Sequence, residues 1–437
     1  MMKVQGEIVL RGDKSLSHRA VIFSALAKGK SKIKNFLKAE DTLNTLRAMQ
    51  KTGVTVIGDV YSDEFEIVSE GLHNFKSPDT VLDMGNSGTA ARLLLGLFSG
   101  FENIEATIDG DESLRKRPMK RITNPLKNFG ASFEPEDLLP IKVSGKKLRP
   151  VIYDETLGSA QVKSALLLAA ISSGVEARIK ENHPSRDHSE KMLRFAGANL
   201  KSIRQPTAEN VIELKPPYNF NPAKYDIWGD ISSAAFFVVL GLLAEEGELI
   251  IKNVLFNPFR DRYIDILIQM GAKIEKVVTG EKCGESGGDL IVKPSLLKGI
   301  SIGKEEIPKI IDELPVLTIA GLFAEGRFEF RGAEELRVKE SDRIKAMADN
   351  LRNLKVNVEE FSDGLSLEGS RGAILEGSIE SFMDHRIIMS FAIAREKAWA
   401  NAGYSKDKNE LIEIKDLNWV KTSFPDFFEL LDKVVFK

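Results

Sequence analysis

Residues 264–277, IDILIQMGAKIEKV, contain the pattern that decides the fold. Apolar residues at helical spacing run up to Met270, Gly271 follows, and a short segment typical of a strand comes next. Glycine at such a place supplies the left-handed backbone conformation that ends a helix. One helix–glycine–strand unit is common in proteins that mix helices and strands, so its meaning depends on whether it recurs.

The unit does recur along the chain, at residues 43–57, 122–133, 190–203 and 346–359. The first three of these copies have glycine in the turn, whereas the last has Leu354 and Lys355. A weaker copy lies near the C-terminus, at residues 430–436. The spacing of the copies is too long for a solenoid. The alternation predicts an α/β protein of two domains, each made of three βαβαββ subdomains.

The composition excludes several classes of function. Of 437 residues, 43% are hydrophobic and 29% are charged, and the formal net charge is −3, which argues against a nucleic-acid partner. The longest apolar run, residues 234–244, is too short to cross a membrane and predicts a buried helix. Cys283 is the single cysteine, which excludes an intrachain disulfide and fits a reducing compartment. We expect a cytoplasmic monomer that acts on small molecules.

The segment Gly12-Asp13-Lys14-Ser15-Leu16-Ser17-His18-Arg19 follows a strand-like run and precedes an apolar helix. Such a junction directs backbone N–H groups and the positive end of the helix dipole at one place. Lys14 and Arg19 add full positive charges there, so the place suits a phosphate or a carboxylate. A basic turn before a helix is also common as a solvated helix end, and other motifs must support the functional interpretation.

Similar segments stand before predicted helices at residues 85–92 (GNSGTAAR), 113–119 (SLRKRPM), 158–164 (GSAQVKS) and 185–189 (SRDHS). Small residues let a ligand approach the backbone, and hydroxyl, amide and cationic groups can bind its oxygens. By itself, each segment would more often be a turn or a helix cap. Together with Lys14 and Arg19 they predict binding of small polyanions.

Carboxylates join the cations in the second half of the chain. Asp312 and Glu313 precede an apolar helix, and the segments 336–343 (LRVKESDR) and 383–386 (MDHR) follow. If residues 336–343 are helical, Lys339 and Arg343 share a face, and an anion between them would relieve their repulsion. The sequence has no Ser-His-Asp pattern and no metal-ligand set. It therefore predicts proton transfer between bound anions without a metal or a cofactor.

Taken in order, these motifs resemble those of the 5-enolpyruvylshikimate-3-phosphate synthase family over nearly the whole chain. The matching segments are GDKSLSHR, GNSGT, SAQVKSALL, SRDH, RVKESDR and DHR, of which SAQ and SRDH are similar to the class II bacterial branch. The resemblance implies the two-domain enolpyruvyl transferase fold, an inside-out α/β barrel. It places an N-terminal domain at residues 13–225 and a C-terminal domain at residues 226–437, with residues 1–12 added to the latter.

The resemblance also implies the reaction. The enolpyruvyl group of phosphoenolpyruvate moves to the 5-hydroxyl of shikimate 3-phosphate and phosphate is released, a step of chorismate and aromatic amino acid biosynthesis. No cofactor or metal is implied. The N-terminal domain is expected to contact both substrates, and the C-terminal domain to add the catalytic carboxylates and further phosphoenolpyruvate contacts.

By motif match, the resemblance implies three sets of site residues. The shikimate 3-phosphate set is Lys14, Ser15, Arg19, Ser159, Ala160, Gln161, Arg186, Asp312 and Lys339. The phosphoenolpyruvate set is Lys14, Gly88, Arg117, Gln161, Arg343 and Arg386, with Asn86 and Thr89 shaping the turn. The catalytic set is Asp312 as proton acceptor at the 5-hydroxyl, Glu340 as proton shuttle at C3, and Lys14 and Lys339, with His385 in a supporting place.

Departures from the family pattern are few, and alternatives remain open at this point. Arg11 stands where the family usually has proline, and Lys421 is out of register with a family lysine that binds phosphoenolpyruvate. Gly88 is expected to leave room for the herbicide glyphosate in the phosphoenolpyruvate site. The alternatives are the sister enzyme that acts on UDP-N-acetylglucosamine, whose mobile loop usually carries a cysteine that residues 111–119 lack, a non-catalytic sugar-phosphate binding protein, and a purely structural protein.

Overall fold

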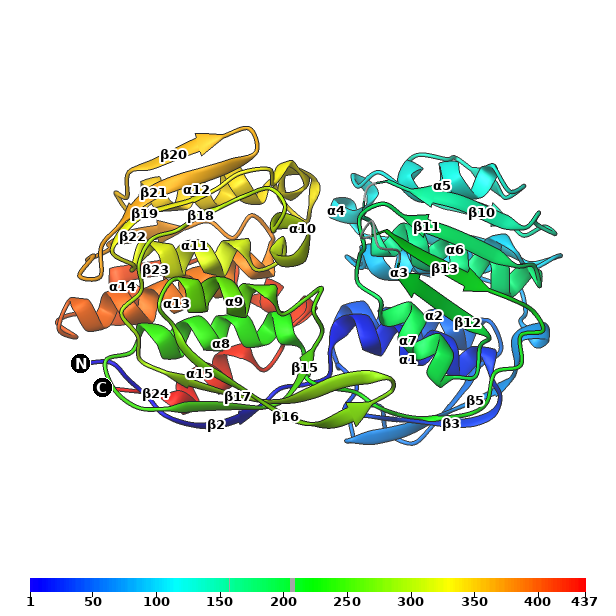
Figure 1. Ribbon diagram of the computed structural model, residues 1–437, viewed down its shortest axis with the longest axis horizontal. Helices are drawn as coiled ribbons and strands as arrows, with labels where there is room; N and C mark the ends of the chain where they lie inside the picture. Colours follow the sequence, from blue (N-terminus) through cyan, green and yellow to red (C-terminus); the bar gives the residue numbers. More distant parts are fainter. Residues whose placement is uncertain (157, 205–208) are drawn as a thin grey trace. The chain divides into compact units, whose positions relative to one another are not determined.

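The computed structural model describes residues 1–156, 158–204 and 209–437, and the chain divides into two compact units (Figure 1). Unit 2 contains Arg11–Trp228 together with Glu281–Glu285. Unit 1 contains Met1–Leu10, Gly229–Gly280 and Ser286–Lys437. Which substrate contacts each part makes stays a prediction.

Unit 2 repeats one sheet topology. Its strands are β3 (Lys28–Lys34), β4 (Thr55–Ile57), β5 (Glu64–Glu70), β6 (Leu82–Asp83), β7 (Glu105–Asp109), β8 (Ser132–Glu134), β9 (Ile141–Ser144), β10 (Val151–Glu155), β11 (Ala177–Glu181), β12 (Leu200–Arg204), β13 (Asn210–Leu214) and β14 (Lys224–Asp226). They form four-stranded sheets in the orders β14-β3-β5-β4, β6-β7-β9-β8 and β10-β11-β13-β12. In each sheet a parallel pair is extended by antiparallel strands, which is the predicted βαβαββ arrangement.

The helices of unit 2 are α1 (Lys14–Leu26), α2 (Glu40–Lys51), α3 (Gly88–Ser99), α4 (Glu112–Arg115), α5 (Lys120–Lys127), α6 (Ala160–Ser173) and α7 (His188–Phe195). Helices α1, α3 and α6 are buried along almost their whole length, and the buried residues of α1 include the polar residues Ser17, His18 and Arg19. Helix α3 packs against α6 so closely that a methyl group on Gly96 would lie 2.4 Å from the carbonyl oxygen of Ala165.

Unit 1 has the strands β1 (Lys3–Val4), β2 (Gly6–Val9), β15 (Leu249–Phe256), β16 (Lys273–Lys282), β17 (Glu285–Lys293), β18 (Ser301–Ile302), β19 (Gly326–Phe330), β20 (Val358–Phe361), β21 (Gly364–Gly369), β22 (Gly377–Ile379), β23 (Ile412–Ile414) and β24 (Val435–Phe436). The turn that joins β16 to β17 belongs to unit 2. The sheet orders are β16-β17-β15-β2 and β18-β19-β21-β20, while the last repeat is divided into the pairs β22-β23 and β1-β24.

The helices of unit 1 are α8 (Ile231–Leu243), α9 (Arg262–Gln269), α10 (Ile307–Ile310), α11 (Leu314–Leu322), α12 (Arg343–Asn353), α13 (His385–Asn401), α14 (Lys408–Leu411) and α15 (Phe427–Val434). Short 3-10 helices η1 (Leu72–Asn74), η2 (Glu334–Val338) and η3 (Leu417–Thr422) complete the helical elements. The apolar run at 234–244 lies in the buried helix α8, as predicted. No helix within the described ranges has both the length and the apolar character to span a membrane.

The helix–turn–strand units found in the sequence are confirmed. After α2, α5, α7 and α9, the glycines Gly53, Gly130, Gly197 and Gly271 have φ between 100° and 109°. Each of these turns is closed by a hydrogen bond from the residue after the glycine to a carbonyl five residues earlier, such as Ala272 N to Leu267 O at 2.9 Å. After α12, Lys355 takes φ 63° and the same bond joins Val356 N to Leu351 O.

Each unit has a four-stranded sheet that contains a strand from a distant part of the chain. In unit 1, β2 pairs in parallel with β15, so that Gly6 lies beside Leu249. In unit 2, β14 pairs in parallel with β3, so that Tyr225 lies beside Ile33. The chain therefore passes from one unit to the other after β2 and again after β14. The predicted two-domain α/β architecture is confirmed.

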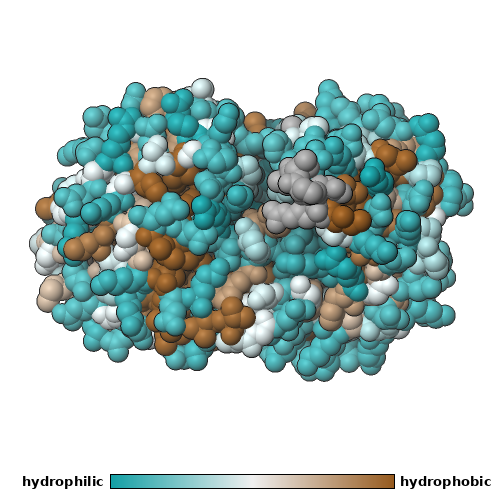
Figure 2. Space-filling model, viewed as in Figure 1, coloured by the Kyte–Doolittle hydropathy of each residue, from teal (hydrophilic) through white to brown (hydrophobic). Residues whose placement is uncertain are grey.

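The surface is mostly hydrophilic on the face shown in Figure 2, with apolar patches gathered over unit 1. Exposed apolar side chains of unit 1 include Val278 and Leu296, which are 65% and 64% exposed. Single exposed apolar residues are ordinary on soluble proteins. The chemistry of the chain is therefore sought in its buried polar groups.

Candidate active site

The basic segment at the start of the chain forms the predicted helix start. Asp13 caps α1 by accepting a hydrogen bond from Leu16 N at 2.9 Å, and Lys14 is the first helical residue. The ammonium of Lys14 lies 3.0 Å from a carboxylate oxygen of Asp41, near the start of α2. Asp41 was not singled out from the sequence, because its partner is on another helix.

Arg19 lies deeper in unit 2 and connects three helices. Its guanidinium donates to Ser189 Oγ at 2.8 Å, to Ser164 Oγ at 2.9 Å and to the carbonyl oxygen of Ser15 at 3.0 Å. Burial lowers the pKa of Arg19 to about 10, which still leaves the side chain charged at neutral pH. A nearby positive charge, that of Arg186, adds to the lowering. Two predicted anion-binding arginines are therefore neighbours.

His18 supports the same region as a buried neutral side chain. Burial, with the charges of Lys14 and Arg19, holds the pKa of His18 well below its ordinary value. Its Nδ1 lies 2.7 Å from Thr45 Oγ1 and its Nε2 lies 3.5 Å from Ser87 Oγ. Because Ser87 caps α3, His18 ties together the starts of α1 and α3.

The glycine-rich turn at 85–88 meets the basic loop that follows β7. Arg117 is 7% exposed and donates to Asn86 Oδ1 at 2.6 Å. Asn86 in turn donates to Asp111 Oδ2 at 2.8 Å. A methyl group on Gly88 would lie 3.4 Å from Arg117 Nη1 and 3.3 Å from Arg92 Nη1. Two arginines therefore face the first residue of α3.

Arg92 joins this turn to the start of α6. It donates to Gln161 Oε1 at 2.7 Å, and Gln161 donates to Thr89 Oγ1 at 3.1 Å. The predicted residues Gly88, Arg117 and Gln161 are thus brought together. Arg92 was missed as a site residue although it ends the segment 85–92, since only the folded structure shows that it points back toward Gly88.

Two further predicted segments meet around a buried lysine. Ser159 caps α6, and Lys163, one turn later, lies 2.9 Å from Glu181 and 2.7 Å from Glu190. All three of these charged side chains are 0% exposed. Burial disfavours the charge of Lys163, but the two carboxylates raise its pKa above the ordinary value. The triad joins α6, β11 and α7 and so holds the loop that carries Arg186.

In unit 1, a buried arginine gathers three carboxylates. Arg343 is 1% exposed and donates to Asp384 Oδ2 at 2.8 Å and to Glu340 Oε2 at 2.6 Å. Its Nη1 lies 3.5 Å from Asp312 Oδ1. Burial would lower the pKa of Arg343, but the carboxylates of Asp384, Glu340 and Asp312 raise it. The predicted catalytic residues Asp312 and Glu340 are therefore neighbours around one guanidinium.

Asp384 anchors the second predicted arginine of unit 1. It caps α13 by accepting a hydrogen bond from Arg386 N at 2.9 Å. Arg386 Nη1 donates to the carbonyl oxygen of Asp312 at 2.7 Å. The start of α13 is thus joined to the segment before α11. Asp384 was quoted in the sequence motif but was given no role there.

The expected pairing of Lys339 and Arg343 on one helical face is wrong. Helix η2 ends at Val338, Lys339 is extended with ψ −150°, and α12 begins only at Arg343. Asp342 causes this break because its side chain caps α12 by accepting a hydrogen bond from Lys345 N at 3.0 Å. The charges that surround Arg343 are carboxylates of the protein.

Comparisons with known proteins agree over the whole chain. The family described as EPSP synthase (3-phosphoshikimate 1-carboxyvinyltransferase) matches residues 1–431. The chain belongs to the EPSP synthase family. A 3-phosphoshikimate 1-carboxyvinyltransferase of Leptospira biflexa is 47% identical, covering 99% of this chain and 98% of that protein. One of Caldicellulosiruptor saccharolyticus is 44% identical, covering 98% and 96%.

Solved structures of this family have the same fold. EPSP synthase from Acinetobacter baumannii is 36% identical, with a TM-score of 0.82 over 100% of this chain and 98% of that one. The enolpyruvyl transferase NikO from Streptomyces tendae, at 16% identity, has a TM-score of 0.73 over 99% and 95% and shows the fold alone. This EPSP synthase family chain transfers the enolpyruvyl group of phosphoenolpyruvate to shikimate 3-phosphate in aromatic amino acid biosynthesis.

The single cysteine of this chain, Cys283, is buried, and its thiol is not activated as a nucleophile. Cys283 is 5% exposed, its Sγ lies 3.4 Å from the carbonyl oxygen of Asp226, and burial raises its pKa to about 12. Reactive cysteines have a low pKa and are accessible. The native enzyme is therefore expected to resist iodoacetamide at pH 7.5 and stay active, while the urea-unfolded chain is alkylated once, as measured by mass spectrometry. Rapid alkylation of the native enzyme with loss of activity would contradict this.

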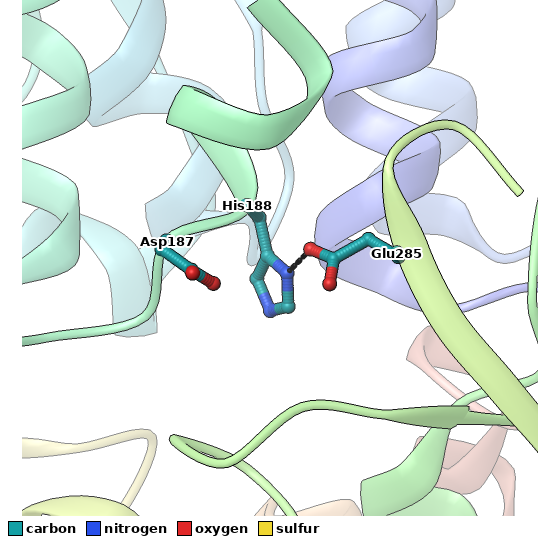
Figure 3. A group of neighbouring side chains, drawn as sticks. All are labelled: Asp187, His188 and Glu285. Atoms are coloured by element: carbon teal, nitrogen blue, oxygen red, sulfur yellow. Dashed lines mark hydrogen bonds and ion pairs between the residues drawn. The ribbon is translucent and has the colours of Figure 1, made fainter. Parts of the chain in front are cut away.

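Across the described ranges, one group of side chains has the spacing of metal ligands, namely Asp187, His188 and Glu285 (Figure 3). The ammonium of Lys191 already lies beside two of these side chains, Asp187 and Glu285. Lys191 Nζ is 2.9 Å from Glu285 Oε2 and 3.3 Å from Asp187 Oδ1. A metal ion would have to displace that ammonium, so the group is better described as an ion-pair cluster.

Proposed function

We propose that the two clusters divide the chemistry of enolpyruvyl transfer. The cluster of unit 2 supplies most of the groups that bind the substrates, and the cluster of unit 1 supplies the carboxylates that move protons together with the further phosphoenolpyruvate ligands Arg343 and Arg386. The observation that carries this proposal is Arg343, which is buried and holds Asp312 and Glu340 on one guanidinium. An acid and a base that are held in place beside a positive charge can exchange protons with an anionic substrate.

The binding sets follow from the motifs. For shikimate 3-phosphate we propose Lys14, Ser15, Arg19, Ser159, Ala160, Gln161 and Arg186, with Asp312 and Lys339. For phosphoenolpyruvate we propose Lys14, Gly88, Arg117, Gln161, Arg343 and Arg386. Lys14 and Ala160 are the first residues of α1 and α6, where N–H groups favour anions. Arginine suits several of these places because its fork pairs with phosphate and carboxylate oxygens.

We assign each catalytic residue to one proton-transfer step. Asp312 accepts the proton of the 5-hydroxyl as that oxygen bonds to C2 of phosphoenolpyruvate, and Glu340 delivers a proton to C3. The C2–O bond to phosphate then breaks, C3 loses a proton to Glu340, and the enol ether and phosphate leave. Lys339 and Lys14 can protonate or stabilise the departing oxygen. The proton that Asp312 took from the hydroxyl leaves on the phosphate by way of Lys339 or Lys14, and Glu340 regains the proton that it gave to C3. All of these residues return to their starting state, so the reaction needs no cofactor.

The subclass, the cellular location and the oligomeric state of the enzyme belong to the same proposal. We place the chain in the class II bacterial type because residues 185–188 read SRDH and residues 159–161 read SAQ. We also propose that the enzyme is cytoplasmic and monomeric. Analytical ultracentrifugation at assay concentrations would test the oligomeric state, and a sedimenting dimer would overturn the monomer.

The first experiment is phosphate release from phosphoenolpyruvate, with and without shikimate 3-phosphate. Release only when both are present is expected. Binding of shikimate 3-phosphate without release would mean a binding protein. Release that requires UDP-N-acetylglucosamine instead would mean the sister reaction.

The variant Gly88→Ala tests the phosphoenolpyruvate set. The added methyl group would lie 3.3 Å from Arg92 Nη1, which must move by a few tenths of an ångström, and 3.4 Å from Arg117 Nη1, in van der Waals contact, so it takes up space beside both guanidinium groups. We expect glyphosate inhibition to weaken by about tenfold or more and the KM for phosphoenolpyruvate to rise, each tenfold change being about 1.4 kcal/mol. Inhibition titrations measure this. Gly372→Ala is the control, since its methyl group meets nothing within 4 Å. Unchanged inhibition of Gly88→Ala would contradict the assignment.

A further inference from the structure

The turn between β16 and β17 places a buried carboxylate beside the start of α7. Cys283 and Gly284 form this turn with φ of 53° and 78°, as two-residue hairpin turns require. A methyl group on Gly284 would lie 3.1 Å from the carbonyl oxygen of Lys191, so the turn approaches the backbone of α7 closely. Glu285 is the first residue after the turn and is 0% exposed.

The carboxylate of Glu285 contacts two residues in the first turn of α7. Glu285 Oε1 lies 2.6 Å from His188 Nδ1 (Figure 3), and Oε2 lies 2.9 Å from Lys191 Nζ. Burial would raise the pKa of Glu285, but His188 and Lys191 hold it at about 2. The side chain is therefore ionised throughout the range in which the enzyme can be assayed.

Other contacts fix this carboxylate in place. The indole N–H of Trp228 donates to the carbonyl oxygen of Glu285 at 2.8 Å. The ammonium of Lys282 lies 3.2 Å from Asp226 Oδ1 and 4.2 Å from the centre of the Trp228 ring. Backbone and neighbouring side chains therefore hold the turn independently of the carboxylate, so a change of Glu285 alone leaves these contacts available.

Glu285 supports the first turn of α7 from outside the helix, together with the Lys163–Glu190 ion pair and the bond from Arg19 to Ser189. The helix begins at His188 and its N-terminus has no hydrogen bond from a capping side chain of its own residue Asp187. Arg186, the proposed ligand of shikimate 3-phosphate, precedes this first turn by two residues. The direction of Arg186 is thus coupled to how firmly His188 and Lys191 are held.

We propose that Glu285 is a positioning residue for shikimate 3-phosphate. It holds His188 and Lys191, and through them the first turn of α7 and the loop that carries Arg186. The inference rests on the proposed role of Arg186 in binding that substrate. We expect its effect to fall on one substrate and not on proton transfer, since Glu285 is 0% exposed and contacts the helix that follows Arg186.

The variant Glu285→Gln keeps the shape of the side chain and removes its charge. We expect the KM for shikimate 3-phosphate to rise about tenfold or more, because a small misplacement of a binding group has an effect of this size. The kcat and the KM for phosphoenolpyruvate should change less than about twofold. Glu285→Asp keeps the charge and should recover part of the loss. Asp226→Asn, which removes the Lys282 ion pair of the same turn, is the control and should leave all three constants unchanged.

A double-mutant cycle that combines Glu285→Gln with His188→Gln tests whether Glu285 acts through His188. Because Glu285 acts through His188, the two losses should not add. Additive losses, equal rises in both KM values, or a fall in kcat alone would overturn the proposal. If Glu285→Gln fails to fold, Glu285→Asp and isothermal titration with shikimate 3-phosphate decide the same question.

Arg186→Ala separates this inference from the proposed function. A raised KM for shikimate 3-phosphate in Arg186→Ala, with none in Glu285→Gln, would overturn the positioning role and keep the site. An unchanged KM in Arg186→Ala would overturn the site assignment on which the positioning role rests.

Discussion

Replacing Glu340 with glutamine is expected to lower kcat by about 10²–10⁴-fold, with little change in either KM. Glutamine keeps an oxygen that can accept the 2.6 Å hydrogen bond from Arg343, so the packing of the cluster survives. It cannot deliver a proton to C3 of phosphoenolpyruvate or take it back. Steady-state phosphate release measures kcat, and exchange of the C3 protons with deuterated solvent reports on the proton transfer itself.

Glu334→Gln is the matched control for this prediction. Glu334 is exposed and begins the 3-10 helix η2 that precedes Glu340. Its change should leave kcat and solvent exchange as they are in the parent enzyme. Normal turnover in Glu340→Gln would remove Glu340 from the mechanism.

Replacing Arg343 with methionine is expected to destabilise the protein by about 3–5 kcal/mol, the usual effect of leaving a buried charge unpaired. Asp384 is 0% exposed and loses its 2.8 Å bond to Arg343 Nε. Urea unfolding followed by circular dichroism measures the loss, and activity should fall below detection because Asp312 and Glu340 lose the same partner.

The pH dependence of this loss has a definite sign. Burial would raise the pKa of Asp384, but Arg343 holds it below its ordinary value, so in the parent the pair's stabilisation is complete above that value and is lost only as the pH falls below it. In Arg343→Met burial alone acts on Asp384 and raises its pKa, so the unpaired carboxylate is neutralised first and the gap in stability between parent and variant should narrow from pH 7 toward about pH 4. The double variant Arg343→Met with Asp384→Asn should recover part of the loss at pH 7. A single-variant loss under about 1 kcal/mol would contradict burial of an unpaired charge.

The repeated turns could be predicted from sequence because their cause is local. A glycine after an amphipathic helix ends it in the same way at Gly53 and at Gly271, whatever surrounds the turn. The turn at Lys355 shows the limit of this reasoning. The backbone there takes the same left-handed conformation without glycine, and the same hydrogen bond closes the turn that joins α12 to β20.

Contiguous motifs were enough to propose candidate site residues such as Lys14 and Arg386, and the roles of these residues stay predictions. The partners that such residues meet from distant segments could not be predicted. Asp384 meets Arg343 across 41 residues, and Glu285 meets His188 across 97. The prediction that Lys339 and Arg343 share a helical face is wrong for a local reason. The side chain of Asp342 caps α12, so one continuous helix does not run through both residues.

The exchange of strands between the units sets an order for synthesis on the ribosome. Unit 2 receives β14 at Lys224–Asp226, so nearly all of its sheets are complete before α8 is made. Strands β1 and β2 emerge first, yet β15, the partner of β2, begins only at Leu249. At about 5–20 residues per second, β2 waits roughly 12–50 s for that partner. The first ten residues are thus a nascent edge strand that must be kept from pairing wrongly while the rest of the enzyme is translated.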